Sequence, residues 1–317
     1  MIAALILGTP RLFAGDDSKG QSDILDPMRN VGGMSAIRRQ IETFRQAGIE
    51  KVVIALGSDA ERIETHCARL CVTFVRYDGD AAHDDGLRAG LEYLRRKCER
   101  AFVAPSNYPF FTVGTLQAML DCEAEVVYPE LESRAGYPFL LPERMFGNIS
   151  FDAVVGSFSE AFRAKGVQSL AVSVQDKGIL LNVGAAEESE INAVVKAHLL
   201  RRLKLDVKVS FSRENSFFGP GALHLLQLTG EAESLMQASK LMGLSYSKAR
   251  KLIARMETYL GYQVIESQHG GRSGGFSTLT PKARILMEKY MLLQAEIGES
   301  AQEIFNRHFG GDIEMPE

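Results

Sequence analysis

The chain has no long apolar segment and few cysteines. No uninterrupted apolar run reaches the roughly 18 residues that a membrane-spanning helix needs, although 45% of the 317 residues are hydrophobic. The opening MIAALIL lacks the basic leader and the cleavage-like sequel of a signal peptide. The four cysteines, Cys67, Cys71, Cys98 and Cys122, show no paired metal-ligand spacing. We therefore expect a cytoplasmic protein without membrane association, whose thiols are reduced and mostly buried.

Strand-like apolar runs alternate with helical stretches through the first two hundred residues. The runs are IAALIL (2–7), KVVIAL (51–56), VTFVRY (72–77), RAFVAP (100–105) and AEVVYP (124–129), with helices expected over 35–47, 59–69, 84–98 and 113–121. This alternation predicts an α/β fold: a mostly parallel, Rossmann-like sheet with helices on both faces. A later strand pair, SLAVSV (169–174) and GILLNV (178–183), is expected before an amphipathic helix over 188–203.

The stretch from Ala222 to Leu292 has the order of a winged helix-turn-helix. A helix (GALHLLQLTG) precedes a short helix (SLMQASKLM), a Gly-Leu turn and a longer helix that Ser245 opens. Gly261 can stop this helix, and the strands VIES and FSTLT flank a glycine-rich tip, HGGRSGG, as a hairpin wing. Thr280 caps a final helix that starts with Pro281. We therefore predict a C-terminal winged helix-turn-helix domain that binds double-stranded DNA.

The longer helix combines an apolar stripe with a basic face. At helical spacing the stripe consists of Ala249, Leu252, Ile253, Met256 and Leu260. Between residues 245 and 285 there are seven lysines and arginines against two glutamates, although the chain has a net charge of -4. A duplex backbone favours such a patch through counterion release. The DNA-binding candidates are Ser245, Tyr246, Ser247, Lys248, Lys251, Arg255, and Gly271 and Arg272 at the wing tip. A solvated helix face or a protein-interaction module are the alternatives.

This C-terminal stretch resembles the DNA-binding domain of molybdate-responsive (ModE-like) transcription regulators, which are similar to LysR-type winged helices. The shared features are the pair Ser245 and Tyr246, the segment from Ile253 to Gly261, and the glycines of the wing. In that family the helix after the wing makes a dimer, so the resemblance implies a homodimer through Ala283 to His308. The expected organisation is an α/β domain over 1–203, a linker over 204–217 and a DNA-binding domain with a dimerisation helix over 218–317.

The N-terminal segment AALILGTPR and the later NVGGMSAIRRQIETFRQAGIEKVVIALGSDAE resemble MobA-like nucleotidyltransferases of molybdenum-cofactor synthesis. These use a loop of the form LAAGxSxRMG, followed by a lysine, to hold a nucleoside triphosphate. In this chain Gly8 is retained, but Pro10 interrupts the second turn and the arginine-methionine-glycine element is absent. The segment SDILD has no lysine, and Lys19 is the nearest in sequence.

Two further motifs of the family lack their carboxylates here. The loop PSNYPF matches the family's P-x-D-x-P motif, whose aspartate helps to hold Mg²⁺, with Asn107 at that position. The segment GILLNVGAAEE matches a D-I-D-T-P-E-D segment, with Asn182 and Gly184 at the two aspartate positions. Because Mg²⁺ prefers carboxylate oxygens, these positions should hold the ion poorly. We expect no metal site and no catalytic residues in this domain.

Two other features have an ordinary structural interpretation. The acidic run YDGDAAHDD contains Asp78, Asp80, His83, Asp84 and Asp85, which are expected in a solvated loop before a helix rather than as metal ligands. Tyr137 stands where the family often has a histidine in a GHP motif, and it can line a pocket or pack in the core.

Two hypotheses about function follow. The favoured one is a dimeric transcription regulator, linked to molybdenum-cofactor metabolism, whose degenerate N-terminal domain serves as a scaffold or senses a nucleotide- or pterin-like ligand. The candidates for the nucleotide pocket are Gly8, Thr9, Lys19, Asn107 and Asn182. The alternative is an active bifunctional nucleotidyltransferase that uses Mg²⁺ and GTP or CTP to transfer GMP or CMP to molybdopterin.

Overall fold

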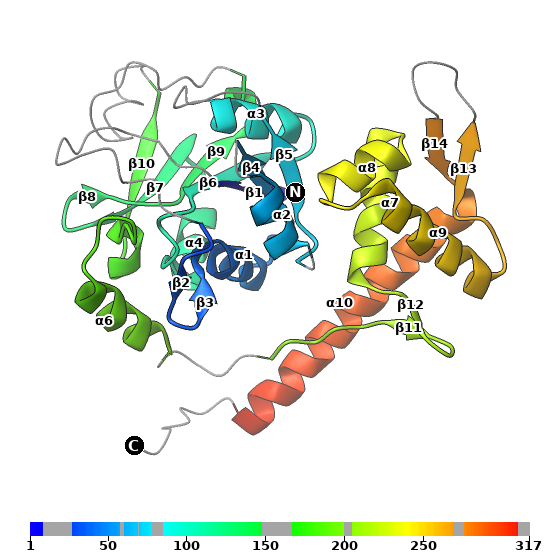
Figure 1. Cartoon of the computed structure of the whole chain (residues 1–317). Coiled ribbons are helices and arrows are strands. Elements are labelled where there is room, and N and C mark those ends of the chain that lie inside the picture. Colours follow the sequence, from blue (N-terminus) through cyan, green and yellow to red (C-terminus); the bar gives the residue numbers. More distant parts are fainter. Residues whose placement is uncertain are drawn as a thin grey trace. The chain divides into compact units, whose positions relative to one another are not determined.

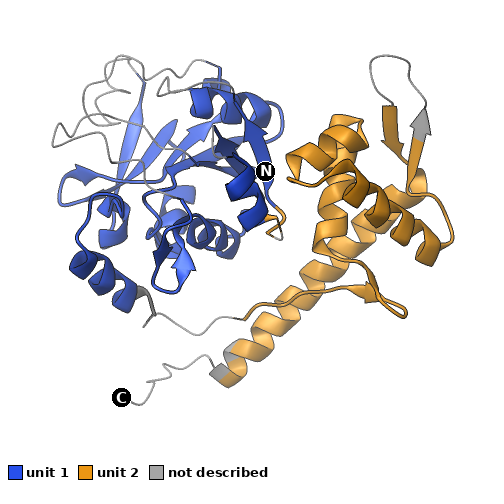
Figure 2. Cartoon of the chain, viewed as in Figure 1, with its two compact units in different colours: residues 1–67, 72–198 blue, residues 68–71, 199–317 orange. Residues whose placement is uncertain are grey.

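The structure is a computed structural model of the chain. It describes residues 1–8, 27–57, 60–68, 70–77, 85–147, 167–199, 205–268 and 276–309. The chain divides into two compact units: unit 1 comprises Met1–Cys67 and Val72–His198, and unit 2 comprises Ala68–Cys71 and Leu199–Glu317 (Figure 2). Within the described part, no helix has both the length and the apolar character that a bilayer crossing requires.

An eight-stranded sheet forms the centre of unit 1, with the strand order β10-β7-β9-β6-β1-β4-β5 and β8 paired to β7 (Figure 1). The strands are β1 (Ile2–Leu7), β4 (Lys51–Leu56), β5 (Thr73–Arg76), β6 (Arg100–Pro105), β7 (Val126–Leu131), β8 (Arg134–Ala135), β9 (Phe139–Pro142) and β10 (Ser169–Ser173). β1 pairs in parallel with β4 and β6, whereas β9 runs antiparallel to β6 and β7. The expected mostly parallel sheet is confirmed.

Helices cover both faces of this sheet. The helices of unit 1 are α1 (Ala36–Gln46), α2 (Ala60–Cys67), α3 (Asp85–Leu94), α4 (Val113–Leu120) and α6 (Glu188–Leu199), with 3₁₀ turns η1 (Glu143–Met145) and η2 (Lys177–Leu180). Leu91 of α3 packs in one core cluster with Leu5 and Val53. On the opposite face, Phe44 of α1 contacts Phe102, whose side chain alternates with those of the first cluster. Strands in the middle of the sheet, such as β1 with the sequence IAALIL, are apolar along their whole length because both of their faces are covered.

Two features of unit 1 differ from the sequence prediction. GILLNV (178–183) is not a strand: its first residues form the 3₁₀ turn η2, because the Asp176 carboxylate accepts the backbone N–H of Gly178 at 3.0 Å. The sheet instead gains β9, from the segment FLLP, which the prediction missed. A small hairpin, β2 (Asn30–Val31) with β3 (Met34–Ser35), precedes α1.

Unit 2 contains three helices, a hairpin and a long final helix, in this chain order. These elements are α7 (Pro220–Ala232), α8 (Leu235–Leu241), α9 (Tyr246–Leu260), β13 (Ile265–Gln268), β14 (Phe276–Leu279) and α10 (Pro281–Phe309). Ser245 Oγ accepts the N–H of Lys248 at the start of α9, and Gly261 ends that helix in the left-handed conformation, with φ of 76°. Thr280 Oγ1 accepts the N–H of Ala283 at the start of α10.

The segment before α7 is folded onto unit 2. A second hairpin joins β11 (Phe211–Ser212) to β12 (Ser216–Phe218), in a region expected to be a linker. Phe211 and Phe218 both contact the ring of the fully buried Tyr290, at centroid distances of 5.3 and 4.9 Å. The Tyr290 hydroxyl donates to the carbonyl oxygen of Val209 at 2.7 Å. These contacts tie residues 209–218 to α10.

Candidate functional site

Two of the nucleotide-site candidates follow neighbouring strands of the sheet. Gly8 follows β1 and Asn107 lies two residues beyond β6, and the strands are joined there by Ser106 N donating to Leu7 O at 3.1 Å. A Cβ atom on Gly8 would lie 2.9 Å from the carbonyl oxygen of Ala55, so the close approach of β4 requires glycine. The carboxyl ends of parallel strands are where ligands bind in open α/β sheets.

The structure brings Asn107 and Asn182 together, although they are 75 residues apart. Asn107 Nδ2 donates to Asn182 Oδ1 at 3.0 Å, and the same oxygen accepts the backbone N–H of Gly184 at 2.9 Å. The backbone N–H of Val183 donates to the carbonyl oxygen of Asn107 at 2.9 Å. The three positions that the family resemblance assigns to carboxylates therefore form one hydrogen-bonded group. We call Asn107 and Asn182 the amide pair.

This group does not fit a divalent cation. Asn182 Oδ1 is already engaged by two N–H donors, Gly184 offers no side chain, and Asn107 contributes one neutral oxygen. Mg²⁺ in proteins is held by carboxylates in a near-octahedral shell. Among the described residues, moreover, no three His, Cys, Asp or Glu side chains gather in a way that could hold a metal ion.

A buried carboxylate lies close by in sequence, but its hydrogen bonds are structural. Asp176 accepts from Thr115 Oγ1 at 2.6 Å, from the N–H of Thr112 at 2.8 Å and from the N–H of Gly178. These bonds join the start of α4 to the turn η2, which leads to Asn182. The sequence analysis did not single out Asp176, because its partners on α4 are more than 60 positions away.

Two arginines that the sequence analysis did not select lie near this group. Arg29 donates to the carbonyl oxygen of Val183 and, at 3.0 Å, to Glu188 of α6. Arg39 of α1 donates to the carbonyl oxygen of Val31 at 2.8 Å and lies 5.0 Å from the centroid of the Phe110 ring. Burial lowers the pKa of Arg39 from its usual value. Both guanidinium groups thus hold backbone segments next to the strand ends.

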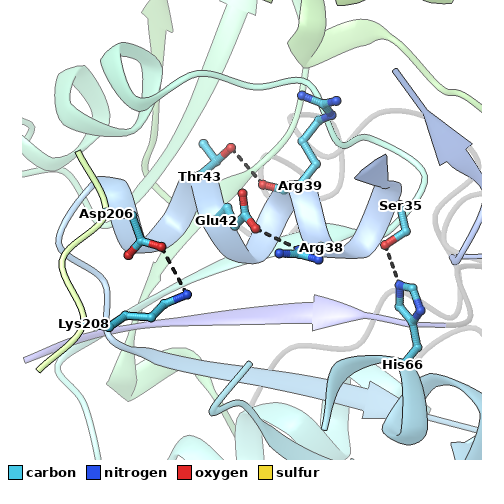
Figure 3. A network of polar contacts seen from close by, with 8 residues as sticks. All are labelled: Ser35, Arg38, Arg39, Glu42, Thr43, His66, Asp206 and Lys208. Atoms are coloured by element: carbon cyan, nitrogen blue, oxygen red, sulfur yellow. Dashed lines mark hydrogen bonds and ion pairs between the residues drawn. The ribbon is translucent and has the colours of Figure 1, made fainter. Parts of the chain in front are cut away.

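Further polar contacts lie on α1 and at the residue before it (Figure 3). The Ser35 hydroxyl lies 2.7 Å from His66 Nε2, so it does not cap the helix that follows it. Arg38 pairs with Glu42 one turn on, at 2.9 Å. The Arg38–Glu42 ion pair lies at the surface and is of the kind that contributes little to stability.

Tyr137 is a core residue. Its side chain is buried, and its ring lies 4.3 Å from that of Tyr108 in the loop after β6. Burial raises the pKa of Tyr137 well above its usual value. The packing interpretation of Tyr137 is therefore the one that the structure supports.

In unit 2 the candidate residues of α9 share its exposed side. Ala249, Ile253 and Met256 are buried against the core of the unit. Ser245 at the N-cap is exposed, as are the candidates within the helix: Tyr246, Ser247, Lys248, Lys251 and Arg255. Arg250 is exposed as well and lies 6.0 Å from the Tyr246 ring centroid. The helix thus separates an apolar side from a cationic one.

Several candidates lie outside the described residues: Thr9, Lys19, Gly271, Arg272 and, in the acidic run, Asp78, Asp80, His83 and Asp84. Asp85, the last acidic residue of that run, is described and stands in the first turn of α3. The four cysteines are all described and form no disulfide; Cys67 and Cys98 are buried, and Cys71 and Cys122 are partly buried.

Residues 27–170 match the family profile of the MobA-like NTP transferase domain. This segment contains Asn107 and ends before Asn182. The N-terminal unit, whose sheet is mixed and mostly parallel, is therefore similar in sequence to a nucleotidyltransferase domain.

Parts of this chain are also similar to three individual proteins. Bifunctional protein GlmU of Cellvibrio japonicus (strain Ueda107) is 24% identical over 130 residues, which cover 40% of this chain and 28% of that protein. Molybdenum-pterin-binding protein MopB of Rhodobacter capsulatus is 29% identical over 91 residues, which cover 29% of this chain and 34% of that protein. The chain thus spans about a third or less of these relatives. The crystal structure of 4-diphosphocytidyl-2C-methyl-D-erythritolsynthase from Anaerococcus prevotii DSM 20548 superposes with a TM-score of 0.49 at 12% identity, covering 63% of this chain and 99% of that one.

Proposed function

We propose that the protein is a DNA-binding transcription regulator whose nucleotidyltransferase-like unit binds a small ligand instead of catalysing nucleotidyl transfer. The observation that carries the proposal is that α9 has its cationic side chains on an exposed side and its apolar side chains on a buried side. Lys248, Lys251 and Arg255 are exposed, while Ala249, Ile253 and Met256 of the same helix are buried. Exposed cations on one side of a helix can bind the phosphates of a duplex, and the release of counterions from the duplex favours this binding.

The surrounding elements support the same function. The order α7, α8, a turn with Gly243 at φ of 62°, and α9 is that of a helix-turn-helix, in which the second helix of the motif enters the major groove. The residues at its N-terminus, Ser245 and Tyr246, are exposed and can reach phosphates or base edges. The hairpin of β13 and β14 that follows has the position of a wing.

A link to molybdenum-cofactor metabolism is part of the proposal. It rests on the match to the MobA-like NTP transferase domain and on the similarity to a protein named as molybdenum-pterin-binding. The ligand that we propose for unit 1 is accordingly nucleotide- or pterin-like. The amide pair of Asn107 and Asn182 supports binding without catalysis, because neither group can supply the negative charge that holds a catalytic cation.

We also propose a homodimer through Ala283 to His308. Ile285 and Leu292, seven residues apart on α10, are 52% and 59% exposed. Residues seven apart lie on the same side of a helix, as in a helix-helix seam. A symmetric dimer would present two copies of α9 to two half-sites of an operator.

Selection from a pool of randomised duplexes, with the full chain at low salt, tests the DNA function. We expect an enriched sequence with two related half-sites, and binding that weakens steeply as salt is raised. Recovery of no duplex at low ionic strength would contradict the proposal and would favour a protein-interaction module.

An active nucleotidyltransferase is the second candidate, and the family match favours it. Isothermal titration with GTP or CTP, with and without Mg²⁺, separates the two. The regulator is expected to show binding that does not depend on the metal and releases no pyrophosphate on addition of molybdopterin. Metal-dependent binding with pyrophosphate release would establish the enzyme instead.

A further inference from the structure

The hydrogen bond between the side chains of the amide pair can run in only one direction. Asn182 Oδ1 accepts the backbone N–H of Gly184, which can only donate, so this oxygen and not the nitrogen must face the turn. The group that approaches the same oxygen from Asn107 must then be its Nδ2. Asn107 Oδ1 consequently points away from the pair, where it is buried and has no hydrogen-bond partner among the described residues. Asn107 thus acts as a donor and Asn182 as an acceptor.

The pair connects segments that are otherwise separate in the chain. Together with the bond from Val183 N to Asn107 O, it holds the loop after β6 to residues 182–184. Val183 is fully buried, in a cluster that includes Ile191 and Val195 of α6. The position of α6 on unit 1 therefore depends in part on this connection.

Two facing carboxylates could not make the same connection by themselves. Ionised carboxylates only accept hydrogen bonds, and two of them at this separation repel each other unless a cation lies between them. An amide carries its own donor. We propose that the Asn107–Asn182 hydrogen bond is a metal-independent bridge. It joins the two segments without an ion, whereas two facing carboxylates would need a divalent cation between them to do so.

The directionality of the bridge makes asymmetric predictions for single substitutions. In Asn182→Asp the carboxylate still accepts from Asn107 Nδ2 and from Gly184 N, so the bridge is retained. In Asn107→Asp the donor is lost and two acceptors face each other. The two variants carry the same charge change, so each is a control for the other. Asn192→Asp, at an exposed position of α6, adds the same charge away from the bridge.

Thermal unfolding of the full chain and of these variants, in EDTA and in millimolar Mn²⁺, tests the inference. We expect Asn182→Asp and Asn192→Asp to unfold close to the wild-type temperature, and Asn107→Asp to unfold about 5 °C lower. The double variant N107D/N182D should be the least stable in EDTA. Mn²⁺ should raise its Tm, and the free Mn²⁺ signal in electron paramagnetic resonance should fall on adding this variant but not on adding the wild type.

Three results would overturn the inference: an Asn107→Asp variant as stable as Asn182→Asp, a wild-type Tm that rises with Mn²⁺, or a double variant that Mn²⁺ does not stabilise. If the double variant does not fold even with Mn²⁺, the comparison of the single variants still decides. None of these measurements involves DNA or a nucleotide, so their failure would be distinguishable from failure of the proposed function.

Discussion

Replacement of Lys248 and Lys251 by alanine should weaken DNA binding uniformly across sequences. Both side chains are exposed on α9, three residues apart, and the structure assigns neither to an ion pair within the described residues. If each neutralises one phosphate, the slope of log K against log salt becomes shallower by about 1.8. If the two contacts contribute nothing at 1 M salt, this change in slope corresponds to a loss in affinity of about 60-fold at 0.1 M salt.

Fluorescence anisotropy with a labelled duplex, over a series of salt concentrations, measures both quantities. The matched control is Lys177→Ala with Lys196→Ala, which removes the same charge from exposed positions of unit 1. The control should retain the slope of the wild type. A double variant of α9 with unchanged slope and affinity would refute the assignment of this side of the helix to the duplex.

Two further predictions concern stability. Gly32 has φ of 66°, and a Cβ atom there would lie 2.4 Å from a methyl group of Val195, whereas Gly33 has φ of 81° and nothing within 4 Å. Gly33→Ala should therefore lower the free energy of unfolding by about 1–2 kcal/mol through backbone strain. Gly32→Ala should lower it by about 1–3 kcal/mol more, because α6 must shift. Equal losses for the two variants in urea unfolding would contradict this packing. Burial raises the pKa of Tyr290 to about 12, whereas its pKa in the unfolded chain is about 10. The stability that the protonated Tyr290 contributes is therefore complete below pH ~10 and is lost as the pH rises towards 12. Tyr290→Phe should remove this part of the alkaline decline and lower the free energy of unfolding by about 1 kcal/mol through the lost bond to Val209; an unchanged difference between urea unfolding at pH 8 and pH 11 would argue against it.

The secondary structure of both units follows largely from local sequence. Runs such as KVVIAL are apolar at almost every position because both faces of the sheet are covered, and this composition predicts a buried strand. In unit 2, Ser245 and Gly261 predict where α9 begins and ends, and the structure has both in those roles. Capping and left-handed termination are properties of a few neighbouring residues, which explains why these boundaries could be predicted.

The errors arose where distant contacts outweigh local preference. GILLNV has the composition of a strand, yet it opens with a 3₁₀ turn because the Asp176 carboxylate binds Gly178 on one side and α4 on the other. The strand β9 was missed because FLLP is short, and its place in the sheet depends on pairing with β6 and β7. The contact of Asp176 with α4 and the pairing of β9 have no signal in the local pattern, whereas the bond from Gly178 to Asp176 is local and was overlooked.

The sequence by itself determined most of the elements and the residue types that stand at the strand ends. Burial period, caps and the asparagines at positions where the family has aspartate are all properties of the chain read in order. Only the tertiary structure decided that Asn107 and Asn182 meet, which of them donates, and that Asp176 has its hydrogen bonds within the fold. The physical reason is that hydrogen bonding is directional and acts over about 3 Å, so a donor and an acceptor 75 residues apart in sequence have a defined relation only after the fold has placed them.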